Sequence, residues 1–241
     1  MSQINLIILP GWGGSRETWL DFVNVVGKNF DNVHVIDLPC FGTVPCPTEV
    51  WSVDDYAEFV RKEILKLNYT GKTILLGHSF GGQIAVTLLA KERYTVSALI
   101  LSGAAVIRPK NSLNRIILGT VAKIGKNIFK LPIIEKFDVL AKKILYGVVG
   151  SNDYRNSTGV KREIFKKAIR DDRKHLLPLI TLPTLVLWGE SDKYVPLKYG
   201  KKIAELIPGA AMHIVKKGGH GLHINNIIEV ELVINEFISH V

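Results

Sequence analysis

Three residues far apart in the chain carry side chains that could together cleave an acyl bond. Ser79 lies in the segment GHSFGG, Asp192 in WGESD, and His220 in the glycine-rich segment KGGHG. A serine hydroxyl is a weak nucleophile unless a histidine takes its proton and a carboxylate orients that histidine. The pattern G-x-S-x-G, which follows an apolar run and precedes a helical one, predicts a nucleophile elbow at Ser79. The chain order Ser, Asp, His is the order expected for that architecture.

Each partner of the serine has an alternative nearby. The chain contains seven histidines, and His223, three residues after His220, is the main other candidate for the base. Glu190 is the alternative to Asp192, which could instead stabilise its own turn by bonding to the backbone. A zinc pair of His220 and His223 would need further ligands, and the surrounding sequence offers none.

Acyl transfer also needs backbone N–H groups that stabilise a developing oxyanion. Phe80, directly after the serine, supplies one such group at the start of a helix. The loop Gly11-Trp12-Gly13 follows the first apolar run, and its glycines allow a close approach of the backbone. We therefore expect the oxyanion hole to consist of the backbone N–H groups of Trp12 and Phe80.

Short apolar runs alternate with helical patterns through most of the chain. This alternation predicts an α/β fold, with a mostly parallel sheet of about six strands and helices on both faces. The expected strands are residues 4–9, 33–37, 73–76, 97–102, 184–189 and 212–215. The expected helices are residues 16–27, capped by Ser15, and 52–67, 83–90, 197–207 and 225–240.

The alternation breaks between residues 104 and 180, which predicts a helical insert in a core formed by residues 1–103 and 181–241. Apolar stripes at 116–128 and 137–145, and a helix from about 157–160 to 170, would form a basic lid over Ser79. Residues 104–175 carry 17 Lys and Arg against 6 Asp and Glu, whereas the rest of the chain carries 14 against 16. One hypothesis is that this charge docks an acidic acyl-carrier protein or an anionic membrane surface. The alternative, which we prefer slightly, is that the lysines only face solvent, as charged helix faces usually do.

Composition narrows the remaining possibilities. Cys40 and Cys46 are too few for a disulfide scaffold, and their spacing matches no common zinc or redox motif, so we expect ordinary loop thiols. The N-terminal residues lack the features of a signal peptide, so we expect a cytoplasmic protein. The basic segment carries no recognised nucleic-acid motif, so nucleic acid is not an expected partner.

The segments GHSFGG, WGESD and KGGHG, together with LPGWGG at residues 9–14 and DLPCFG at residues 37–42, resemble the α/β-hydrolase fold family. Within it, the chain is similar to small serine carboxylesterases, such as those that demethylate pimeloyl-carrier-protein esters. The resemblance implies hydrolysis of an ester, thioester or lactone through an acyl-enzyme, without cofactor or metal. Relatives with Asp in place of Ser79, the haloalkane dehalogenases and epoxide hydrolases, are excluded. The catalytic residues would be Ser79, Asp192 and His220.

Two features depart from the family pattern. Pro10 stands where the family usually has His, and the antiparallel hairpin that usually opens the sheet has no counterpart before Ile4. A non-catalytic ligand-binding protein on the same fold is the alternative function, because a fold does not fix an activity.

Overall fold

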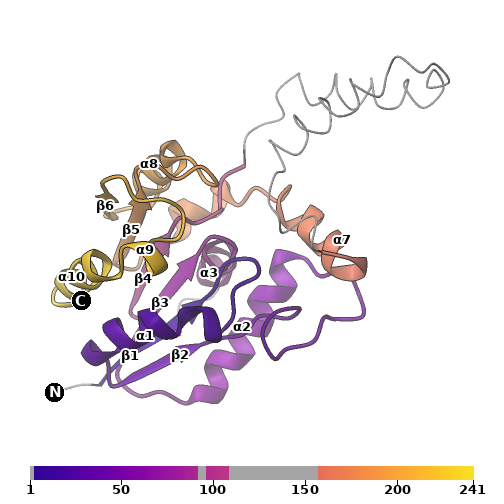
Figure 1. The fold of residues 1–241 in the computed structure, drawn as a ribbon, viewed down its shortest axis with the longest axis horizontal. Helices are drawn as coiled ribbons and strands as arrows, with labels where there is room; N and C mark the ends of the chain where they lie inside the picture. Colours follow the sequence, from indigo (N-terminus) through magenta and orange to yellow (C-terminus); the bar gives the residue numbers. More distant parts are fainter. Residues whose placement is uncertain (1–2, 92–95, 109–156) are drawn as a thin grey trace.

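The computed structural model describes residues 3–91, 96–108 and 157–241. Its centre is a six-stranded sheet in the order β2-β1-β3-β4-β5-β6, and every neighbouring pair is parallel (Figure 1). The strands are β1 (Ile4–Leu9), β2 (Asn32–Val35), β3 (Lys72–His78), β4 (Ala98–Ser102), β5 (Thr184–Gly189) and β6 (Ala211–Val215). The predicted α/β fold with a parallel sheet is therefore confirmed.

Helices connect the strands. The described α-helices are α1 (Leu20–Val26), α2 (Val53–Leu67), α3 (Phe80–Lys91), α7 (Gly159–Ala168), α8 (Leu197–Leu206), α9 (Leu222–Asn225) and α10 (Ile227–Ile238). Short 3-10 helices are η1 (Glu17–Trp19), η2 (Gly27–Asn29) and η3 (Lys174–Leu179). No helix within the described ranges is long and apolar enough to cross a membrane.

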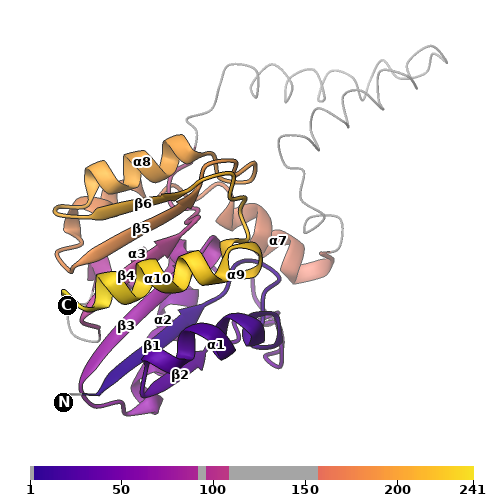
Figure 2. The same ribbon diagram turned by 60° about the vertical axis from the view of Figure 1, so that its left-hand side comes forward.

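Both faces of the sheet are covered, because successive side chains of a buried parallel strand point to opposite sides. In β1, Leu6 and Ile8 belong to a core shared with α1 and α10. Ile7 and Leu9 belong to the opposite core, which is shared with α2, α3 and α8. Figure 2 shows α1 and α10 lying across the same face of the sheet.

The parallel arrangement sends the segments after β1, β3, β4, β5 and β6 to the same edge of the sheet, where open α/β folds place their sites. These segments contain the loop around Trp12, then Ser79, Gly103, Asp192 and His220. The fold thus gathers the residues that the sequence analysis selected from separate motifs.

The predicted insert is described only at its two ends. Residues 104–107 are buried in the core, and the predicted third helix corresponds to α7. The apolar stripes at 116–128 and 137–145 lie outside the described residues. The division into a core and a lid therefore stays a prediction.

Candidate active site

Ser79 forms a sharp turn between β3 and α3. Its φ angle is 52°, in the left-handed region that a residue with a side chain rarely occupies. The backbone holds this conformation from both sides: Ser79 N–H donates to the carbonyl of Ser102 at 3.0 Å, and Ala105 N–H donates to the carbonyl of Ser79 at 2.9 Å. A Cβ on Gly77 would lie 2.7 Å from the Cα of Gly82, so the turn needs glycine there.

The loop after β1 packs directly against this turn. A Cβ on Gly11 would lie 3.1 Å from the Cβ of Ser79, and a Cβ on Gly81 would collide with the carbonyl oxygen of Leu9. The Trp12 ring also contacts the Phe80 ring, with centroids 5.4 Å apart. The two segments that the sequence analysis expected to form an oxyanion hole are therefore neighbours.

The backbone N–H groups of Trp12 and Phe80 have no acceptor in the described part of the chain. For Phe80 this follows from its position, because the first N–H groups of a helix lack a partner within the helix. Such groups can bind an anion, and the helix dipole favours negative charge at the same place.

His220 is paired with a carboxylate. Its Nδ1 lies 2.7 Å from Oδ2 of Asp192, whose side chain is fully buried. The other oxygen of Asp192 accepts hydrogen bonds from the backbone N–H groups of Tyr194 and Val195, both at 2.8 Å. A carboxylate acts as an acceptor, so Nδ1 of His220 is the donor in this hydrogen bond.

The alternative carboxylate, Glu190, and the alternative base, His223, make other contacts. Glu190 accepts the backbone N–H of Lys217 at 3.0 Å. His223 stacks on Trp19, with ring centroids 4.0 Å apart, and its Nδ1 is buried without a hydrogen-bond partner among the described residues. Of the two histidines in this loop, His220 is the one hydrogen-bonded to Asp192.

A third histidine adjoins the pair. His78 is 6% exposed, and its Nδ1 lies 3.0 Å from the carbonyl oxygen of Ser102, to which it must donate. Burial, followed by the positive charges that His220 and His223 would carry, holds the pKa of His78 well below its ordinary value. Burial likewise lowers the pKa of His223 to about 4. Both rings are therefore neutral at pH 7.

Ser79 and His220 make no hydrogen bond to each other within the described residues; the side-chain bond of His220 is to Asp192. Contacts of their neighbours nevertheless place Ser79 and His220 near each other. The His78 ring, one residue before Ser79, is 4.8 Å from the His220 ring, and Gly103 would bring a Cβ to 3.1 Å from Nδ1 of His220. Among the residues described, no group of three or more His, Cys, Asp and Glu could hold a metal ion.

A sequence profile of the alpha/beta hydrolase family matches residues 6–230. The chain belongs to the alpha/beta hydrolase family.

Relatives of this hydrolase have varied names. The biotin biosynthesis bifunctional protein BioHC of Teredinibacter turnerae is 24% identical over 261 aligned residues, which cover 97% of this chain and 44% of that protein. A 2-hydroxy-6-oxononadienedioate/2-hydroxy-6-oxononatrienedioate hydrolase of Burkholderia vietnamiensis is 23% identical over 250 residues, which cover 97% of this chain and 86% of the relative. The chain thus spans less than half the length of the bifunctional relative.

Solved structures agree on the fold. A bromoperoxidase of Bacillus anthracis superposes with a TM-score of 0.75 at 20% identity, over 99% of this chain and 92% of that one. An esterase of Exiguobacterium antarcticum superposes with a TM-score of 0.73 at 19% identity, over the same shares of the two chains.

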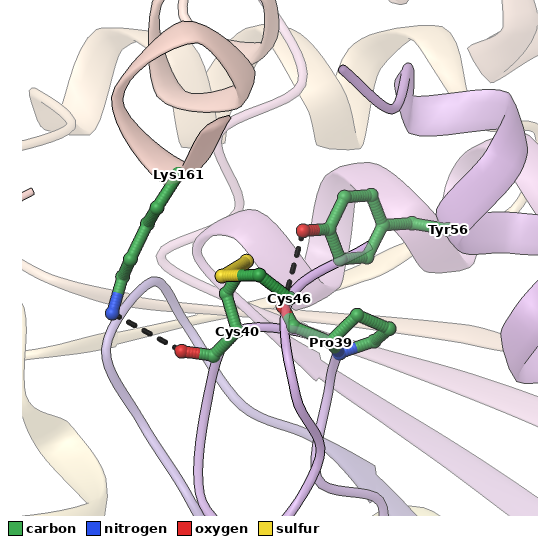
Figure 3. The surroundings of a disulfide bond; sticks show 5 residues. All are labelled: Pro39, Cys40, Cys46, Tyr56 and Lys161. Carbon is green, nitrogen blue, oxygen red and sulfur yellow. Dashed lines mark hydrogen bonds between the residues drawn. A yellow bond between two sulfur atoms is a disulfide. The ribbon is translucent and has the colours of Figure 1, made fainter. Parts of the chain in front are cut away.

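The two cysteines of this hydrolase form a disulfide, so the expectation of ordinary loop thiols at Cys40 and Cys46 is wrong (Figure 3). The segment after β2 folds back on itself, because the N–H of Cys40 donates to the carbonyls of Val44 and Pro45 at 3.1 and 3.3 Å. This turn brings the two Cα atoms to 4.0 Å. Nothing in the spacing of the cysteines indicates it.

The disulfide loop supports the site through Phe41. The Phe41 ring lies 4.9 Å from that of Trp12, and the Lys161 ammonium lies 4.4 Å above the Phe41 ring. Lys161 also donates to the carbonyl of Cys40 at 3.1 Å, and the Tyr56 hydroxyl donates to the neighbouring carbonyl of Pro39 (Figure 3). The disulfide therefore restrains a segment on which the Trp12 side chain packs.

We predict that the double variant Cys40→Ser/Cys46→Ser is less stable than the oxidised protein. Losing a short cross-linked loop should lower the free energy of unfolding by about 2 kcal/mol, because the unfolded chain regains entropy. Urea unfolding of wild type with and without dithiothreitol measures the difference. Dithiothreitol should leave the double variant unchanged, and two titratable thiols in untreated wild type would contradict the prediction.

Proposed function

We propose that this chain is a serine hydrolase that cleaves a carboxylic ester, or a related thioester or lactone, through an acyl-enzyme. The observation that carries the proposal is the His220–Asp192 hydrogen bond beside the strained turn of Ser79. A nucleophile, a base and a group that orients the base are the minimum set for such chemistry.

In the first step, the Ser79 hydroxyl oxygen attacks the carbonyl carbon and Nε2 of His220 takes its proton. Asp192 holds the imidazole in the tautomer whose Nε2 is unprotonated, and it stabilises the imidazolium that forms. The hydrogen bond at 2.7 Å and the two backbone bonds to the other carboxylate oxygen support this role, because they fix the orientation of Asp192.

The developing oxyanion would accept hydrogen bonds from the backbone N–H groups of Trp12 and Phe80. Their lack of other acceptors among the described residues supports this assignment. Collapse of the tetrahedral intermediate expels the alcohol or thiol, which takes the proton from His220. Water then attacks the acyl-enzyme by the same route and releases the acid.

Ser79 and His220 make no hydrogen bond to each other among the described residues, and this does not count against the assignment. Hydrogen bonds between a nucleophile and its base are often long without substrate and tighten only when the complex forms. The hydrogen bond between His220 and Asp192, by contrast, has to exist before the substrate binds, since it sets the tautomer of the base.

Replacing the nucleophile gives the first test. We expect the wild type to hydrolyse part of a p-nitrophenyl ester series from acetyl to dodecanoyl, and Ser79→Ala to lose this activity. Ser239→Ala, which removes an exposed hydroxyl from the C-terminal turn, is the matched control and should keep it. A separate assay should use 2-hydroxy-6-oxononadienedioate, which is not an ester, because relatives are named for that compound.

A fluorophosphonate probe separates inactivity from an unsuitable substrate. Mass spectrometry should find the probe on the peptide that contains Ser79 in the wild type, and no labelling in Ser79→Ala. If the wild type neither hydrolyses an ester nor reacts with the probe, the non-catalytic ligand-binding alternative replaces the proposal.

The two carboxylates of the loop after β5 give a second test. Asp192→Asn should lower kcat by about 10³- to 10⁴-fold, because an amide can hold the imidazole in the wrong tautomer. Glu190→Gln, two residues away, should stay within about threefold of wild type, which is a small change on the free-energy scale. Equal losses in both variants would show that the carboxylate assignment is wrong.

A carrier-linked substrate is the second candidate, favoured by the excess of basic residues between 104 and 175 and by the similarity to a biotin biosynthesis protein. An acidic acyl-carrier protein would then dock on this segment. Lys167 and Lys174 are exposed within its described part, and Lys201 is exposed on α8.

If the carrier docks here, kcat/KM for a carrier-bound ester should fall with added salt, whereas kcat/KM for a neutral p-nitrophenyl ester should not. Lys167→Glu/Lys174→Glu should weaken turnover of the carrier-bound ester selectively, and Lys201→Glu should not. Equal salt dependence for both substrates would remove the docking hypothesis and leave the esterase proposal intact.

A further inference from the structure

Five rings from four segments form a continuous series through the candidate site. In order they are Trp19, His223, His78, His220 and Tyr194. Successive centroids are 4.0, 4.7, 4.8 and 5.2 Å apart. We call this set the ring series. The imidazole of His220 is thus in contact with His78 and Tyr194, and His78 in turn contacts His223.

The inner part of the ring series is rigid. Trp19 is 1% exposed, and the ring planes of Trp19 and His223 are only 6° apart. The hydrogen bond from Nδ1 of His78 to the carbonyl of Ser102 at 3.0 Å anchors one edge of the His78 ring, and the neighbouring rings pack against the rest of it. The flat stack against a buried indole therefore holds His223 against a ring that its own hydrogen bond anchors at one atom only.

The inner histidines are also uncharged, since burial lowers the pKa of both His78 and His223. The Nδ1 of His223 has no hydrogen-bond partner among the described residues. An uncharged ring with an unpaired nitrogen contributes through its shape and its stacking, because it makes no hydrogen bond there to orient a neighbour.

We propose that His223, stacked on Trp19, is a positioning residue for His220. Its ring fills the space beside His78 and keeps His78 packed against His220, so that His220 remains bonded to Asp192 with Nε2 available to Ser79. The inference rests on the proposed function of His220 as the base. It assigns to His223 the role of support, in place of the role of alternative base that the sequence left open.

Two substitutions separate the ring of His223 from its polarity. His223→Phe keeps a flat ring that can stack on Trp19 but has no nitrogen, and His223→Asn keeps a polar group of similar reach but has no ring. His175→Ala is the matched control, because His175 is exposed on η3 and takes no part in the ring contacts given above.

We expect His223→Asn to lower kcat for p-nitrophenyl esters by about 10- to 100-fold, the loss typical of a misplaced catalytic group. KM should change by less than about twofold, because the proposal gives His223 no contact with the substrate. His223→Phe should recover kcat to within about fivefold of wild type, and His175→Ala should match wild type, on the same scale. If His223→Asn does not fold, His223→Gln makes the same comparison.

A spectroscopic measurement tests the positioning without turnover. The proton between Nδ1 of His220 and Asp192 should give a low-field NMR signal, assigned by its loss in Asp192→Asn. In a Ser79→Ala background, the signal should persist with His223→Phe and broaden or vanish with His223→Asn. Thermal unfolding of each variant shows whether the fold is intact.

Two results would overturn the inference: a sharp signal and unchanged kcat in His223→Asn, or a loss in His223→Phe as large as in His223→Asn. The second would mean that the nitrogen matters and the ring does not. If the wild type hydrolyses no ester and resists the fluorophosphonate probe, the proposed function fails. The NMR signal then still decides whether His223 positions the His220–Asp192 pair.

Discussion

The left-handed backbone conformation of Ser79 constrains the segments that pack around the turn between β3 and α3. A residue with a side chain in this region costs on the order of 1–3 kcal/mol, so it persists only where its surroundings fix it. Here β3 and α3 fix it from within the chain, and backbone hydrogen bonds fix it to Ser102 at the end of β4 and to Ala105 in the segment that follows. The same geometry requires glycine at 77 and 81, and it allows the loop after β1 to approach close enough to bring Trp12 against Phe80.

An all-parallel sheet explains why distant motifs meet. Each strand delivers its following segment to one edge, so motifs separated by more than a hundred residues in sequence become neighbours. Central strands buried on both faces place these segments on rigid supports. Asp192 illustrates the result: its side chain is fully buried, yet each oxygen has a hydrogen-bond partner, so the cost of burying the carboxylate is offset. The hydrogen bonds that offset the burial of Asp192 therefore also fix its orientation.

Sequence reasoning succeeded where the signal was local. The bounds of β1 and β5 agree with the predicted 4–9 and 184–189, because a β-branched, apolar run ends there at Pro10 or after Gly189. Sequence reasoning failed where tertiary contacts determine the structure. Ser15 does not cap the first helix; instead its carbonyl accepts the Thr18 hydroxyl. The disulfide and the ring series likewise depend on how loops fold back and on which segments meet, which spacing alone cannot specify.

The histidines show how burial divides roles among identical side chains. A carboxylate partner stabilises a protonated imidazole, and neither His78 nor His223 has one as a hydrogen-bond partner among the described residues. His220 alone of the three is hydrogen-bonded to a carboxylate. In the proposed mechanism, this hydrogen bond would stabilise the proton that His220 takes from Ser79. In the same mechanism, the two neutral rings of His78 and His223 would lie beside His220 without competing for the proton taken from Ser79.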